Sequence, residues 1–160
     1  MKKLFLILFL VTFLFSDIYD IKYKGITLGK IDSLSTLKDD YLKARVTNSI
    51  VKFIMRKDFF IFYAGKKPNF PKTKYKKDSK KIIYALKRTI EAKPYDETFI
   101  IDDKRKINIK CFQKNLCTFD YFSKGEHSAS GIIEFKNGKF YKLYEKKSSL
   151  EIIKDEKGDK

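Results

Sequence analysis

The sequence is poor in the residue types on which many catalytic and binding sites depend. Its 160 residues include no tryptophan, one histidine and two cysteines. Together these side chains fall short of the four ligands of a tetrahedral zinc site. The chain also lacks a glycine-rich phosphate loop, a dinucleotide fingerprint and a calcium loop. We therefore expect no metal, no cofactor and no enzymatic activity.

Arginine is scarce although the chain is strongly basic. The chain has 36 basic and 20 acidic residues, a net charge of +16, and its only arginines are Arg45, Arg56, Arg88 and Arg105. Proteins that read nucleic acid usually rely on the planar guanidinium of arginine. A surplus of lysine favours adhesion to polyanions, although it is also typical of AT-rich genomes. We expect the partner to be an anionic envelope surface, a lipid or a protein, and not nucleic acid.

One long hydrophobic run is present, at the N-terminus. Residues 4–15 are almost entirely apolar, Lys2 and Lys3 precede them, and Ser16 is a small residue at a suitable cleavage point. This is the build of a secretory signal peptide, and the run is shorter than the ~20 residues of a spanning helix. We expect residues 1–16 to be removed on export to the periplasm, with an uncleaved signal that anchors the protein in the membrane as the alternative. No second long apolar run follows, so we expect no membrane span after signal removal.

The remaining sequence predicts a single β-rich domain over residues 17–153, followed by a polar tail over residues 154–160. Apolar and polar residues alternate, so that Leu42, Ala44 and Val46 share one face of a strand. The fold class we expect is mainly β. It is a curved antiparallel sheet or half-barrel with one α-helix packed on it.

Strand patterns cover much of the chain on both sides of Pro94. Residues 50–55 fit either a short helix or a buried strand, and residues 58–64 predict an aromatic strand. After Pro94 the strand segments are ETFII, KINIKCF, LCTFDYF, GIIEFK, KFYKLYE and SLEIIK. Asn137-Gly138 is the strongest hairpin signal, because both residues tolerate the positive φ of a type I′ turn.

One helix pattern lies in the middle of the chain, over about residues 79–92. An aspartate or a serine at positions 78–79 can cap its first turn. Ile82, Leu86 and Ile90 fall on one face, which gives the helix an apolar stripe to bury.

Two short motifs resemble those of a known family. They are Tyr19-Asp20-Ile21-Lys22-Tyr23 with Gly25-Ile26 and Gly29, and Asp78 followed by Tyr84-Ala85-Leu86 with Arg88. Similar motifs occur in the exported bacterial family catalogued as domain of unknown function 3108. The late tryptophans of that family are absent here, and nothing distinctive aligns after Cys117. The resemblance implies a β-rich envelope protein with one packed helix, and it implies no activity.

Cys111 and Cys117 enclose five residues, and a three-residue turn at 113–115 would place them opposite each other on a hairpin. In an oxidising compartment such a pair predicts a disulfide, and closing so small a loop contributes roughly 2 kcal/mol. A redox-active pair would require two intervening residues and a helix N-terminus. The disulfide is the interpretation we favour, with a redox pair and a metal site as alternatives.

His127 lies near Ser128 and Ser130, which raises the possibility of a hydrolase. Neither serine has the flanking glycines of a nucleophile elbow, and adjacent residues of a strand point to opposite faces. We interpret residues 123–131 as a polar loop between strands. Paired carboxylates occur in turn-like segments at Asp39-Asp40, Asp96-Glu97 and Asp102-Asp103, and we interpret the last pair as part of a hairpin connection whose aspartates satisfy local amides.

The segment KKPNFPKTKYKKDSKK, residues 66–81, concentrates the positive charge. We interpret residues 66–77 as a proline-broken connection with a short edge strand at 70–76, where lysines also deter association between sheets. The candidate contacts with an anionic surface are Lys66, Lys67, Lys72, Lys74, Lys76, Lys77, Lys80 and Lys81.

Two functions fit these features. The first is an exported, non-enzymatic envelope protein that acts as a binding or assembly module toward an anionic surface, a lipid or a partner protein. The alternative is a periplasmic carrier that holds a lipid or another apolar ligand in the concave face of the sheet. The 15 phenylalanines and 10 tyrosines allow such a site, although they also suit simple core packing. A cavity larger than ~300 Å³ lined by these aromatics would favour the carrier.

Charge reversal at Lys72, Lys74, Lys76 and Lys77 should leave the fold intact but weaken binding to anionic lipid vesicles, because it removes attraction to the head groups. Circular dichroism and vesicle co-sedimentation at low salt would measure the two effects. Unchanged binding would reduce the lysines to a compositional bias.

Overall fold

The computed structural model describes residues 17–77, 82–92 and 96–156. The first half of the described chain contains β1 (Tyr19–Tyr23), β2 (Ile26–Ile31), η1 (Ser35–Asp39), β3 (Tyr41–Val46), α1 (Ser49–Met55), β4 (Phe59–Tyr63) and β5 (Thr73–Lys77). The second half contains α2 (Ile82–Ala92), β6 (Glu97–Asp102), β7 (Arg105–Phe112), β8 (Leu116–Ser123), β9 (Glu126–Lys136), β10 (Lys139–Glu145) and β11 (Leu150–Lys154).

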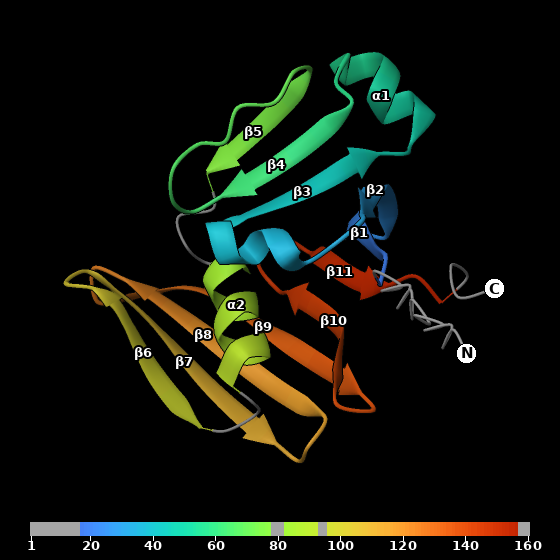
Figure 1. The fold of residues 1–160 in the computed structure, drawn as a ribbon. Coiled ribbons are helices and arrows are strands. Elements are labelled where there is room, and N and C mark those ends of the chain that lie inside the picture. The colour runs from blue at the N-terminus through green and yellow to red at the C-terminus, as the bar shows by residue number, and fades with distance from the viewer. Residues whose placement is uncertain (1–16, 78–81, 93–95, 157–160) are drawn as a thin grey trace, which may run out of the picture.

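The strands of these described segments form one curled, open sheet. Their order is β5-β4-β3-β2-β1-β11-β10-β9-β8-β7-β6, and every neighbouring pair is antiparallel except β4 with β5. The sheet bends around α2, which lies on its concave side (Figure 1). The predicted fold class, a mainly β curved sheet with a packed helix, is confirmed.

Tight turns set the register of the hairpins. Three two-residue turns have positive φ at both positions: Lys24-Gly25, Lys124-Gly125 and Asn137-Gly138. This is the backbone of a type I′ turn, whose twist matches that of the flanking strands. The hairpin predicted at Asn137-Gly138 is therefore confirmed.

The two ends of the described chain meet in the middle of the sheet. β1 pairs with β11 from Tyr19 opposite Lys154 to Tyr23 opposite Leu150. The amide of Asp155 donates a hydrogen bond to the carbonyl of Ile18 at 2.8 Å. β11 thus includes Lys154, the first residue of the predicted polar tail, and Asp155 adds one backbone hydrogen bond to Ile18, which directly precedes β1.

The face that α2 buries differs from the predicted one. Leu86 and Ile83 are fully buried and Ile82 nearly so, whereas Ile90 is exposed. The buried face is therefore rotated toward Ile83. It also includes Thr89, whose hydroxyl donates a hydrogen bond to the carbonyl of residue 85. The predicted cap at residues 78–79 lies outside the described residues.

α1 settles the ambiguity over residues 50–55, which form a short helix and not a strand. The Asn48 side chain accepts a hydrogen bond from the Val51 amide at 3.1 Å, which caps the first turn. Arg56 ends the helix in the left-handed conformation. No residue of α1 is buried.

Gly131 of β9 is a position where a side chain cannot be accommodated. A Cβ atom there would lie 2.3 Å from the Tyr144 carbonyl oxygen and 2.4 Å from the Phe119 ring. Phe119 is fully buried and fills the space above the glycine. The missing side chain thus allows an aromatic ring to cover the strand.

Gly131→Ala should lower the free energy of unfolding by about 1–3 kcal/mol, the usual cost of overpacking a core. Urea unfolding followed by circular dichroism would measure the loss. Ser130→Ala, one residue away on the opposite face, is the matched control and should change stability by less than about 0.5 kcal/mol. Equal effects of the two substitutions would contradict this account.

Candidate functional site

A pocket of about 360 Å³ lies on the concave side of the sheet, next to the beginning of α2. Its lining is mostly apolar and comes from both sides of the β1–β11 junction. The lining residues are Ile21, Tyr23, Leu28, Phe60, Ile61, Phe62, Lys74, Tyr75, Lys76, Ile82, Glu145, Ser148 and Leu150.

Two lysines of β5 belong to this pocket because of strand register. β5 pairs with β4 so that Lys74 lies beside Phe60 and Lys76 beside Phe62. Paired residues of neighbouring strands share a face of the sheet, so these lysines lie on the same face as the pocket aromatics. The ammonium of Lys76 lies 6.0 Å from the centre of the Phe62 ring. The pocket thus combines an apolar lining with two cations at the edge of the sheet.

Glu145 is the buried charge of the pocket lining. Its carboxylate accepts hydrogen bonds from the Lys147 amide at 2.9 Å, from the Ser148 amide at 2.8 Å and from the Ser148 hydroxyl. These donors come from the turn between β10 and β11, and their hydrogen bonds offset the cost of removing the carboxylate from water. Glu145 therefore holds the turn that closes one side of the pocket.

The outer face of the same strands carries a separate aromatic layer. The Tyr75 hydroxyl accepts a hydrogen bond from the Phe70 amide at 2.8 Å, which folds the proline-containing connection back over β4 and β5. Lys43 places its ammonium 4.2 Å from the Phe59 ring centre and 4.4 Å from that of Phe70. Because Phe70 belongs to this layer, the edge strand begins at Thr73 and not at residue 70 as predicted.

The structure divides the lysines predicted to contact an anionic surface. Lys74 and Lys76 face the pocket, whereas Lys67 lies 4.3 Å from the Tyr75 ring centre on the other side of β5. Lys72 lies 4.0 Å from Asp58, and Lys66 is exposed in the connection. Lys80, Lys81 and the side chain of Lys77 lie outside the described residues. Those described do not share one face, and their binding role stays a prediction.

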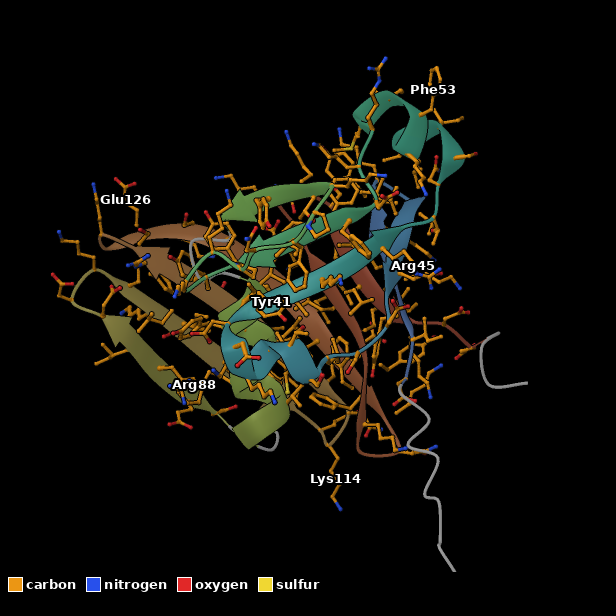
Figure 2. The ribbon with its side chains drawn as sticks, turned by 45° about the horizontal axis from the view of Figure 1, so that its top comes forward. Tyr41, Arg45, Phe53, Arg88, Lys114 and Glu126 are labelled. Atoms are coloured by element: carbon orange, nitrogen blue, oxygen red, sulfur yellow. A yellow bond between two sulfur atoms is a disulfide. The ribbon has the colours of Figure 1, made fainter. Side chains whose placement is uncertain are left out.

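Cys111 and Cys117 form the predicted disulfide. They occupy directly opposite positions of β7 and β8, and the turn between the strands is the predicted one at 113–115, with Gln113 in the left-handed region. Lys114 in this turn lies on the far side of the molecule from Phe53 of α1 (Figure 2). Neither cysteine lines the pocket, so the bond stabilises a hairpin at a distance from it.

The interpretation of residues 123–131 as a loop is wrong. The turn is confined to Lys124-Gly125, and His127 lies in β9, because the strand pairing with β8 continues to Glu126. The Nε2 atom of His127 is 2.9 Å from a carboxylate oxygen of Asp120 in an exposed cross-strand pair. The turn role of Asp102 is confirmed, since its carboxylate accepts a hydrogen bond from the Lys104 amide at 3.1 Å.

Comparisons with known proteins give no match: no family model, no curated protein and no solved structure matches the chain. The resemblance to domain of unknown function 3108 is thus neither supported nor contradicted. Within the described residues, no group of three or more histidine, cysteine or acidic side chains could hold a metal ion. Over the same residues, no helix has the length and apolarity to cross a membrane.

Reduction of the Cys111–Cys117 disulfide should lower the free energy of unfolding by about 2 kcal/mol, because it frees the unfolded chain from a small loop. Urea unfolding with and without a reductant would measure this change. The sequence has no other cysteines, so no second bond complicates the comparison. Identical unfolding curves, with the reduced state verified by mass, would show that the bond contributes nothing.

Proposed function

We propose that the protein is an exported, non-enzymatic binding protein that holds an amphiphilic ligand in the pocket of its half-barrel. The ligand has an apolar body and an anionic head group, as a long-chain carboxylic acid has. The observation that carries this proposal is the meeting of an aromatic pocket with two lysines on the same concave face.

The apolar lining of the pocket favours a ligand site over a filled core, and it distinguishes this pocket from two polar hollows of about 400 and 370 Å³ elsewhere on the described surface. The pocket volume of about 360 Å³ exceeds the ~300 Å³ at which small-molecule sites usually begin. Phe60, Phe62 and Tyr23 contribute aromatic surface, and Leu28 and Ile82 contribute aliphatic surface. A volume near the lower limit suits one hydrocarbon chain better than the two chains of a diacyl phospholipid.

The charges at the pocket favour an anionic head group. Lys74 and Lys76 extend from β5, an edge strand of the described sheet. Their long aliphatic stems can cover apolar surface there while the ammonium groups stay exposed to water. The carboxylate of Glu145 is already bonded to its own turn, so it offers less attraction to a cationic head group. A carboxylate or phosphate ester at the mouth would be attracted by both lysines.

Export to the periplasm is part of the same proposal. It is supported by the signal-like first 16 residues of the sequence, which lie outside the described residues, and by the disulfide, which is typical of oxidising compartments. A carrier in an aqueous compartment would shield the apolar part of its ligand from water.

Lys74→Glu combined with Lys76→Glu should weaken binding of a fluorescent long-chain fatty acid by about tenfold, because it replaces attraction to the carboxylate by repulsion. Binding of the corresponding uncharged alcohol should change by less than about threefold. Fluorescence titration of the protein recovered after export would measure both affinities.

Two further variants test the location of the site. Lys104→Glu combined with Lys124→Glu makes the same change in net charge in two turns that contact each other away from the pocket, and it should leave both affinities unchanged. Leu28→Trp should fill the pocket and weaken acid and alcohol alike. The proposal would be overturned if neither the double variant, Lys74→Glu with Lys76→Glu, nor the single variant Leu28→Trp weakened binding of the acid.

A further inference from the structure

α1 presents an unusual amount of apolar surface to solvent. The exposed fractions of Ile50, Phe53 and Ile54 are 68%, 83% and 72%. Residues spaced by three and four positions lie on one side of a helix, so these three side chains form a single patch, the apolar tip. Phe53 projects at the outer end of the molecule, away from the sheet and from α2 (Figure 2). Exposed apolar groups that gather in this way mark a contact surface.

The apolar tip is held firmly in place. The Asn48 side chain both caps α1 and donates a hydrogen bond to the Thr27 carbonyl at 3.2 Å. The Lys52 ammonium lies 3.0 Å from a carboxylate oxygen of Asp58 and lowers the pKa of that group by hydrogen bonding to it. These bonds tie the N-terminus of the helix to β2 and its middle to Asp58, which directly precedes β4. The exposure of the tip is therefore a property of the folded protein.

Cations lie within α1 and beside it. Lys52 lies within α1, Arg56 and Lys57 follow it directly, and Lys72 joins them beside Asp58. Four cations against one carboxylate leave this end of the molecule positive. An exposed helix face of aromatic and aliphatic side chains, with lysine and arginine nearby, is typical of segments that bind the interface of an anionic bilayer.

A second copy of the chain is a poorer occupant of this surface. A stable interface buries more than about 1,000 Å² in total, which a seven-residue helix does not offer by itself. Two copies that met through α1 would also bring the same cations together, at a cost in repulsion. An anionic lipid surface has the opposite charge and needs no matching shape.

We infer that α1 docks the protein on an anionic lipid bilayer, with Ile50, Phe53 and Ile54 inserted among the head groups and with Arg56 and Lys57 close to the lipid charges. The backbone that leads into α1 also contacts the pocket lining, because the Thr47 amide donates a hydrogen bond at 3.2 Å to the carbonyl of the pocket residue Leu28. Docking through α1 would bring the part of β2 that contains Leu28 close to the membrane. No residue of α1 lines the pocket, so docking through α1 does not require a ligand there.

The absence of tryptophan allows a direct test. Phe53→Trp supplies the only tryptophan of the chain, as does the control Ile100→Trp, whose site on β6 is 78% exposed but lies in a different part of the fold. Vesicles with equal amounts of phosphatidylglycerol and phosphatidylcholine should shift the emission of Phe53→Trp to shorter wavelength and leave that of Ile100→Trp unchanged. Equal shifts, or no shift of Phe53→Trp at low salt, would overturn the inference.

Affinity measurements complete the test. Phe53→Ser with Ile54→Ser should weaken co-sedimentation with these vesicles at least tenfold, whereas Ile100→Ser with Phe112→Ser, an equally apolar pair elsewhere on the surface, should change it by less than twofold. Fatty-acid binding in the pocket should survive both pairs, so failure of docking and failure of the ligand site are separate results. A concentration-dependent dimer that Phe53→Ser abolishes, without vesicle binding, would assign the tip to a second copy and overturn the inference.

Discussion

The pairing of β1 with β11 is the constraint on which the rest of the structure depends. It joins strands from the two ends of the described chain, from Tyr19 opposite Lys154 to Tyr23 opposite Leu150. On one side of this junction lie β2 to β5, and on the other lie β10 to β6. Burial of the inner face requires the two sides to curl toward a common cover, which α2 provides. Because α2 packs mainly against β7, β10 and η1, it covers the two sides unequally. The pocket lies where β1, β2, β4 and β5 extend beyond this cover.

Local patterns predicted much of this fold. The alternation in residues 41–46 and in strands after Pro94 such as β8 and β9 follows from period-two burial, which a strand of a one-sided sheet shows. The strand at 58–64 was predicted from its aromatic content instead, and its burial does not alternate because both of its faces are covered. Turns with positive φ and a three-residue hairpin loop predicted the register, and with it the Cys111–Cys117 bond. These features depend on residues close in sequence, so their signals survive without knowledge of the tertiary structure.

The candidate site depends on contacts that local patterns do not contain. Lys74 and Lys76 face the pocket only because β5 pairs in parallel with β4 in one particular register, and a shift of one residue would turn Tyr75 inward in their place. Ile83 is buried and Ile90 exposed because the sheet, and not the helix pattern alone, fixes the rotation of α2. Glu145 and Ser148 were missed altogether, since a carboxylate bonded to its own turn has no distinctive spacing. The apolar run in α1 was visible, but its exposure was not.

The lysines of β5 illustrate how one constraint can serve two purposes. A strand at the edge of a sheet presents unpaired backbone groups to other chains, and charged side chains oppose such pairing. In β5, alternation sends Tyr75 to the outer aromatic layer and leaves Lys74 and Lys76 on the inner side, where the same charges border an apolar pocket. Apolar residues at these positions would extend the core and invite edge pairing, whereas lysines keep the pocket accessible to water at its rim. Solubility of the sheet edge and attraction for an anionic head group therefore favour the same residue type, so lysine at positions 74 and 76 does not by itself identify a ligand. The unfilled apolar space beside these lysines is the feature that favours a ligand.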